Sequence, residues 1–308
     1  MEVFYACCCG LDVHAKTVVA CLVTNGRKET RTFATMTEDL LQLGDWLHSV
    51  GCTHVAIEST GVYWKPVFNI LEGLLTVILV NARHIKAVPG RKTDVRDCEW
   101  LADLLRHGLL KASFIPPPEI RELRELVRYR QTIITEHTAV ANRIQKLIES
   151  ANIKLGQVAS DVLGLSGRLM LQALAAGETN AETLAELAQG KLKSKKAELR
   201  RALTGCLTPV QRWVLTELLT REEELEAART RVETRIGEEV AACTDPLVPE
   251  AVELLESIPG VGQRTAQTIV AEIGVDMSRF PSAKHLASGA GVCPGNHESA
   301  GKRKSGRP

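Results

Sequence analysis

The chain has 308 residues, 44% of them hydrophobic, so it is long enough for two or three domains with a real core, and wholesale disorder is excluded. Aromatic residues make up only 4%, which argues against a platform for stacking single-stranded nucleic acid, and no apolar run is long enough to span a membrane. Lys and Arg number 38 against 37 Asp and Glu, and the formal net charge of +1 alone indicates no nucleic-acid partner, although a total charge hides local patches.

The first 115 residues alternate strand and helix signals. The predicted strands are 3–13, 16–24, 28–34, 54–57 and 76–80, and the predicted helices are 37–50, one that follows Gly61, and 93–107. Asn25-Gly26 is a strong two-residue hairpin turn between the second and third strands. Three strands joined by hairpins and followed by alternating helices and strands predict a mixed sheet covered by helices.

Three consecutive prolines, Pro116 to Pro118, mark the clearest boundary in the chain. Beyond them, apolar residues recur at helical spacing from Leu123 to Ile148, and a second long helix is predicted over 209–243. Helices of this length predict a coiled coil or an extended helical pair that serves oligomerisation. The expected domains are therefore 1–115, 116–243 and 244–308.

Nine cysteines are scattered along the chain, and three of them are adjacent, Cys7 to Cys9. An odd number without a C-x-x-C pair supports neither a disulfide framework nor a zinc knuckle and predicts a cytoplasmic protein. The adjacent three fall in an apolar run, where cysteine behaves as a small hydrophobe. The N-terminus lacks the basic stretch and long apolar core of a secretion signal.

Four acids occupy positions that suit metal binding. Asp12 lies at the end of the first apolar run and Glu58 at the end of the 54–57 strand, where an ionised carboxylate is costly unless it is paired or bound to a cation. Asp94 and Asp97 are three residues apart and share one helix face. Meeting at one end of the sheet, these acids suit two hard divalent cations, most simply Mg²⁺, for phosphodiester chemistry on DNA.

Each acid also has a structural interpretation. Asp12 could sit in a turn, Glu58 could pair with Lys65, and Asp94 could cap a helix. The order first strand, fourth strand, final helix favours the cluster, because a ribonuclease-H-like domain carries its metal ligands on these elements. No GxxxxGK[ST] loop is present, so nucleotide hydrolysis of the P-loop type is excluded.

A second motif lies at residues 255–273, LESIPGVGQRTAQTIVAEI. Gly260 and Gly262 predict a tight helix–hairpin–helix turn whose backbone amides, at a helix N-terminus, can hold a DNA phosphate. Arg264 adds a charged contact. The alternative is a helical hairpin used only for packing.

Ser299 lies in a Gly-rich stretch followed by Lys302, Arg303 and Lys304. A serine there can attack a phosphodiester while the basic residues neutralise the phosphate, with His297 or metals activating the hydroxyl. By chemistry alone, a serine in such a stretch is more commonly a solvated loop residue.

Together these segments resemble the DEDD insertion-sequence transposases, insertion-sequence family one-ten, which include the pilin-gene invertase. The resemblance covers essentially the whole chain and rests on GLDVHAKT, AIESTGVYW, KTDVRDCEWLADLLRHG, IPGVGQRTAQTIVAEIG and NHESAGKRKSG. It implies an α/β N-terminal ribonuclease-H/RuvC-like domain, a long helical coiled-coil middle and an α-helical C-terminal domain with a helix–hairpin–helix.

The resemblance also implies roles. The four acids would bind Mg²⁺, and Ser299 would be the nucleophile that forms a covalent phosphoserine link to DNA. Lys92, with His14, Lys16 and Thr17, would lie near the metals or the nucleic acid. The acid site and the serine would come from different subunits of a homodimer or homotetramer, and a bridge RNA would guide the reaction.

The implied function is that of a DNA transposase or site-specific recombinase. Family members continue well past the serine, so the 244–308 domain is expected to be C-terminally truncated. Two alternatives remain open from the sequence. One is a RuvC-like junction nuclease that hydrolyses DNA through the acids alone, and the other is an inactive remnant that binds DNA through the hairpin. The basic segments 83–92 and 191–201 are candidate nucleic-acid contacts, although a solvated charged face is the commoner explanation.

Overall fold

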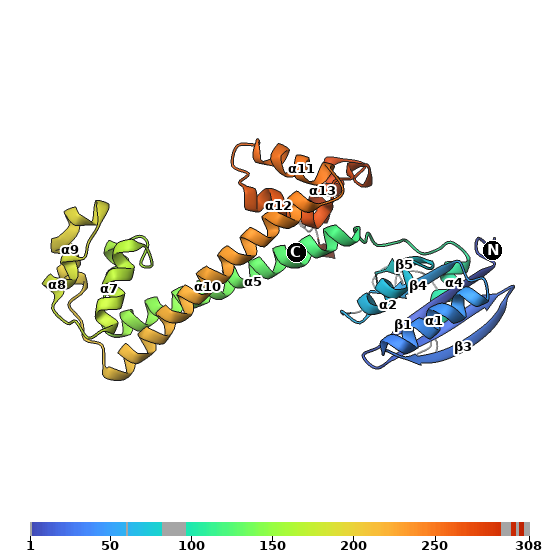
Figure 1. The fold of residues 1–308 in the computed structure, drawn as a ribbon, viewed down its shortest axis with the longest axis horizontal. Coiled ribbons are helices and arrows are strands. Elements are labelled where there is room, and N and C mark those ends of the chain that lie inside the picture. Colours follow the sequence, from blue (N-terminus) through green and yellow to red (C-terminus); the bar gives the residue numbers. More distant parts are fainter. Residues whose placement is uncertain (1, 60, 82–96, 291–296, 300–301, 305–308) are drawn as a thin grey trace. The chain divides into compact units, whose positions relative to one another are not determined.

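The computed structural model describes residues 2–59, 61–81, 97–290, 297–299 and 302–304 (Figure 1). The chain divides into two compact units, one of residues 1–115 and one of residues 116–308. The first is a mixed α/β sheet with helices and the second is almost entirely helical, as the sequence predicts. A further domain boundary near residue 243 stays a prediction.

The first unit contains a five-stranded sheet in the order β3-β2-β1-β4-β5. Its strands are β1 (Cys7–Val13), β2 (Thr17–Thr24), β3 (Arg27–Ala34), β4 (His54–Glu58) and β5 (Thr76–Val80). The first three strands pair antiparallel, whereas β4 lies parallel to both β1 and β5. The predicted mixed sheet is therefore confirmed, although β1 begins at Cys7 and not at residue 3.

Helices cover both faces of this sheet. On one face, α1 (Thr37–Ser49) and α2 (Trp64–Leu71) pack with Leu11 and Ile57, which point to that side because strand side chains alternate. On the other face, α4 (Asp97–Arg106) packs with Cys8 and Ala56. Of the three adjacent cysteines, Cys8 and Cys9 are fully buried core residues, as the sequence predicts, whereas Cys7 is only partly buried.

The contact between α4 and β1 depends on Gly10. A Cβ atom at Gly10 would lie 2.2 Å from the carbonyl oxygen of Cys98 and 2.6 Å from the amide nitrogen of Ala102. Both atoms belong to the backbone of α4, so no side-chain rotation relieves the clash. Glycine at this position lets the helix lie directly on the strand.

Two long helices form the frame of the second unit, α5 (Pro118–Ser150) and α10 (Pro209–Ala242). They run antiparallel, because Ser150 bonds Gln211 at one end and Glu119 bonds Cys243 at the other. Each begins with a proline in its first turn, where the missing N–H costs nothing, and Thr208 adds a capping box to α10. The middle region is thus an extended helical pair within one chain; a coiled coil between subunits stays a prediction.

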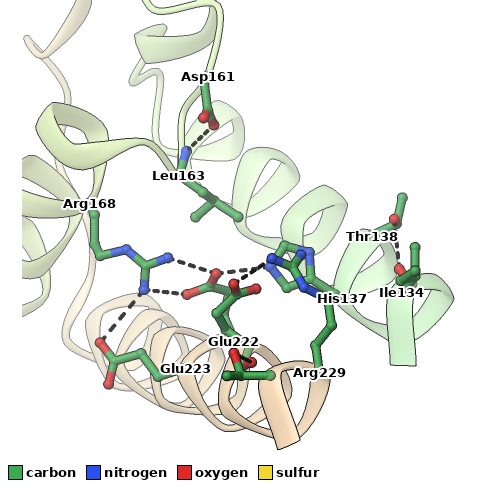
Figure 2. A network of polar contacts seen from close by, with 11 residues as sticks. Ile134, His137, Thr138, Asp161, Leu163, Arg168, Glu222, Glu223 and Arg229 are labelled. Atoms are coloured by element: carbon green, nitrogen blue, oxygen red, sulfur yellow. Dashed lines mark hydrogen bonds and ion pairs between the residues drawn. The ribbon is translucent and has the colours of Figure 1, made fainter. Parts of the chain in front are cut away.

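A small helical lobe connects the C-terminal end of α5 to the N-terminal end of α10. It contains α6 (Leu155–Val158), α7 (Leu165–Ala175), α8 (Ala181–Glu186), the 3₁₀ helix η1 (Gly190–Lys195) and α9 (Lys196–Ala202). Figure 2 shows the polar network that holds α7 on the long helices. Glu222 of α10 is only 1% exposed; it pairs with Arg168 of α7 at 2.6 Å and accepts a hydrogen bond from His137 of α5 at 2.9 Å. A buried carboxylate needs such partners, so this network fixes the lobe in place.

The unit ends in further helices, of which α12 packs on α5. They are α11 (Leu247–Glu256), α12 (Gln263–Ile273), the 3₁₀ helix η2 (Met277–Arg279) and α13 (Ala283–Gly289), and the short strands β6 (His297–Ser299) and β7 (Lys302–Lys304) pair antiparallel. Arg130 of α5 is 3% exposed and donates hydrogen bonds to the Gln267 side chain and the Arg264 carbonyl. Within the part of the chain that the structure describes, every helix is too short or too polar to cross a membrane.

Candidate functional site

Two of the predicted acids lie at neighbouring ends of parallel strands. Leu11 of β1 is partnered with Ile57 of β4, and Asp12 and Glu58 are the next residues along the two strands. Because side chains alternate, both acids belong to the face opposite Leu11, which is the face that α4 covers. Asp12 lies inside β1, which excludes the alternative that it sits in a turn.

The third predicted acid, Asp97, belongs to α4, the helix that covers this face. Asp97 is the first residue of α4, and the next residue, Cys98, contacts β1 at Gly10, two positions before Asp12. Hydrogen bonding with Cys21, burial and the nearby Asp12 carboxylate raise the pKa of the Cys98 thiol, an electrostatic sign that Asp12 lies close to the start of α4. The other two predicted residues of this region, Asp94 and Lys92, lie outside the described residues.

The chemistry of these side chains suits a hard cation. Asp12 is partly accessible, with 30% of its side chain exposed, and its Oδ2 lies 3.2 Å from Nε2 of His14. Carboxylate oxygens are the ligands that Mg²⁺ prefers. Among the described residues, no group of three or more His, Cys, Asp or Glu side chains is placed closely enough to hold a metal ion. A four-acid site would need Asp94 in addition.

The segment predicted as a helix–hairpin–helix folds as α11, the turn 257–262 and α12, and its identity as that DNA-binding motif stays a prediction. Gly260 has a φ of +90°, in the left-handed region that favours glycine, and Gly262 precedes the first turn of α12. Among the described residues, no atom outside the neighbouring backbone lies within 4 Å of a Cβ built at either glycine, so these residues leave the turn uncovered. The first amides of α12 have no acceptor within the helix, as at every helix N-terminus.

Arg264, predicted to touch a phosphate, makes an ion pair with Glu233 of α10 at 2.8 Å and keeps 54% of its side chain exposed. The guanidinium therefore has a role in docking α12 on the helix pair.

Ser299 is the last residue of β6, and its backbone is partnered with Lys302 of β7. Glu298 is partnered with Arg303 and His297 with Lys304, so the predicted nucleophile and the predicted basic residues share one hairpin. This hairpin belongs to the second compact unit, whereas Asp12, Glu58 and Asp97 belong to the first.

Sequence reasoning missed two residues that position these parts. Gly10 allows the close contact of α4 with β1, and a glycine within an apolar strand is the signal that indicates such an approach. Arg130 anchors the hairpin, and its signal is an arginine at a seam position of α5, three residues after Val127 and three before Ile133.

Comparison with known proteins agrees with this arrangement. A DEDD family model described as Transposase matches residues 9–153, and a model described as Transposase IS116/IS110/IS902 family matches residues 252–308. The transposase for insertion sequence element IS1111A of Coxiella burnetii is 25% identical over 256 residues, 82% of this chain and 59% of that protein. The pilin gene-inverting protein of Moraxella lacunata is 23% identical over 301 residues, 94% of this chain and 73% of that protein.

A third relative is the insertion element IS110 uncharacterized 43.6 kDa protein of Streptomyces coelicolor, 29% identical over 239 residues, 70% of this chain and 56% of that protein. The chain thus spans little more than half the length of the Streptomyces and Coxiella proteins. With matches at both ends, the chain belongs to the IS110-type family of DEDD insertion-sequence transposases.

Proposed function

We propose that this chain is the recombinase of an insertion sequence and that it cleaves and rejoins DNA. The observation that carries the proposal is the position of Asp12 and Glu58 at neighbouring strand ends, on the sheet face that α4 covers. The family matches over residues 9–153 and 252–308 support it. With Asp94, these acids would hold Mg²⁺, which when bound supplies charge neutralisation at a phosphodiester.

Ser299 is the proposed nucleophile. Its hydroxyl oxygen forms a bond to phosphorus, the bridging bond to the departing DNA strand breaks, and the departing oxygen takes up a proton as the serine proton is released. The new phosphoserine ester keeps the energy of the broken bond, so a second DNA hydroxyl can reverse the step and free the serine. No nucleotide hydrolysis is required, which agrees with the lack of a P-loop motif.

Around this step, Lys302, Arg303 and Lys304 would neutralise the phosphate from the opposite strand of the hairpin. Gly260, Gly262 and Arg264 would bind the DNA backbone at a place distant from the reacting bond. We further propose a guide RNA and a homodimer or homotetramer as partners. Since the acids and the serine lie in separate compact units, a site assembled from two subunits is consistent with the chain.

The test uses the full chain and a plasmid that carries the DNA flanking this gene. With Mg²⁺, we expect strand cleavage and a covalent protein–DNA adduct that survives denaturation. Asp12→Ala should abolish both, whereas Asp45→Ala, at an exposed acid of α1, should change neither. Ser299→Ala should abolish the adduct while Ser278→Ala retains it. Cleavage that persists in Ser299→Ala would exclude the serine mechanism and favour direct hydrolysis by a junction nuclease.

A further inference from the structure

The helical lobe carries a concentration of positive charge that the proposed reaction does not use. Between residues 191 and 201 the chain has six Lys and Arg and a single acid. Four of these cations are exposed and, within the described residues, pair with no carboxylate: Lys191, Lys193, Lys195 and Arg201. We call these four residues the lobe basic surface.

The two remaining cations of the segment differ from these four because each pairs with an acid. Lys196 pairs with Glu186 of α8, and Arg200 lies 3.6 Å from Glu182 of the same helix. These pairs connect α9 to α8 and leave little net charge there. The 3₁₀ helix η1, by contrast, buries none of its residues, so its three lysines contribute nothing to the core of the lobe. Unneutralised cations kept in solvent favour an anionic partner.

A cavity of about 490 Å³ adjoins this surface. Lys191 and Lys195 line one side of it, and Ser160 and Gln189 add polar groups. Asp161 also lines the cavity, but one of its oxygens accepts a hydrogen bond from the Leu163 amide, which fixes the carboxylate on the backbone (Figure 2). The volume lies within the range of about 300–1,000 Å³ that is typical of ligand pockets.

The surface is held at a fixed distance from the helical hairpin. The Glu222 network ties the lobe to the long helices, and the hydrogen bond from the Lys154 amide to the Ala202 carbonyl holds α9 against the segment that follows α5. Arg130, which anchors α12, lies 20 residues along α5 from Ser150, where the lobe begins, or about 30 Å at the rise of a straight α-helix. The lobe therefore offers contacts that the hairpin cannot make.

We propose that the lobe basic surface binds the phosphodiester backbone of a nucleic acid, as a contact site separate from the helical hairpin. The inference rests on the proposed function for the presence of nucleic acid. Three unpaired lysines on one short exposed helix favour a partner that carries many negative charges, and the phosphate backbone of duplex DNA or of a folded RNA supplies one charge per nucleotide. An acidic protein is the competing partner for the test.

The test measures binding of the full chain to a labelled duplex DNA and, separately, to a labelled RNA hairpin, by fluorescence anisotropy at several salt concentrations. The variant Lys191→Gln/Lys193→Gln/Lys195→Gln removes three unpaired cations. We expect its affinity for one of the two probes to fall by at least about tenfold at 0.1 M salt and the salt slope to become shallower by about two to three. The probe that shows the loss identifies the source of the backbone.

The matched control removes the same charge from cations that already have acid partners: Lys196→Gln/Arg221→Gln/Arg235→Gln. It should bind both probes nearly as the wild type does. Equal affinities and slopes for the two triple variants would overturn the proposal, as would equal competition by poly-glutamate. Hydrogen exchange of the wild type provides a check without substitutions, since residues 189–203 should gain protection on binding. If Asp12→Ala abolishes cleavage but the lysine variant binds as the wild type does, the lobe site is rejected and the proposed reaction stands. If Asp12→Ala still cleaves but the lysine variant loses binding, the proposed reaction is rejected and the lobe site stands.

Discussion

Replacing Gly10 by alanine tests whether the contact of α4 with β1 builds the acid site. The added Cβ would lie 2.2 Å and 2.6 Å from two backbone atoms of α4, much closer than the ordinary contact distance of 3.4–4 Å. The helix must retreat by about 1 Å to restore a normal distance. Asp97, the first residue of that helix, would move with it, away from Asp12 and Glu58.

The expected cost has two parts. Overpacking a core typically destabilises a protein by about 1–3 kcal/mol, and the upper end applies here because backbone atoms cannot rotate aside. A displacement of about 1 Å in a catalytic group can lower a rate by about 10²-fold. Urea unfolding and Mg²⁺-dependent DNA cleavage by Gly10→Ala measure the two effects.

Gly73→Ala is the matched control, because a Cβ at this exposed glycine meets no atom of the described part of the chain within 4 Å. It should leave both stability and cleavage close to wild type. If Gly10→Ala were as stable and as active as Gly73→Ala, the close approach would not matter, and the reasoning that α4 delivers Asp97 to the strand ends would be refuted.

Three further predictions concern stability and reactivity. Glu222→Leu breaks a buried ion pair and should cost about 3–5 kcal/mol in urea unfolding, whereas Glu223→Leu at a largely exposed neighbour should cost under about 1 kcal/mol. Arg128 of α5 donates two hydrogen bonds to the Glu272 carboxylate and holds its pKa below the ordinary 4.5. The ionised carboxylate therefore stabilises the fold fully above pH 4.5, and this stabilisation is lost as the pH falls through the lowered pKa. Glu272→Gln should lower Tm near neutral pH and have no effect on Tm in strong acid. Burial raises the pKa of Cys52 to about 12 while Cys206 is exposed, so mass mapping after brief alkylation should find Cys206 modified and Cys52 protected; early modification of Cys52 would contradict its burial.

Much of the first unit could be predicted from the sequence, because its signals are local. Apolar runs that end at turn residues gave the positions of β2, β4 and β5 closely, and Asn25-Gly26 adopts the left-handed backbone that its hairpin requires. The predicted start of β1 at residue 3 is too early, because the apolar residues before Cys7 resemble a strand. Exposed Val3 and Phe4 lie outside the sheet.

The second unit was harder to predict because its organisation depends on contacts between distant residues. Periodicity predicts that α5 and α10 each have an apolar face, but it does not show whether that face meets another helix of the same chain or of a partner. Pairs such as Glu119 with Cys243 and Ser150 with Gln211 settle this for the single chain. The burial of Arg130 was equally hidden, since arginine is rarely found in a core without partners.

The candidate site was predictable in kind but not in geometry. Type and position along the strands point to Asp12 and Glu58, and the parallel pairing of β1 with β4 places them at neighbouring strand ends. The contribution of Asp97 depends on how closely α4 approaches, which follows from one glycine. The role of Asp94, outside the described residues, stays a prediction.

The near-neutral total charge conceals two opposite local fields. At physiological salt the screening length is about 8 Å, so a phosphate responds only to the charges around it. The acids at the strand ends concentrate negative charge where a cation would be held, whereas the lobe has eight Lys and Arg against five Asp and Glu over residues 151–208. Arg130 and the start of the lobe are separated by about 30 Å of helix, several screening lengths. Charge changes in the lobe should therefore leave the electrostatics at the Arg130 anchor of α12 unchanged, so nucleic-acid binding by the lobe and by the hairpin can be tested separately.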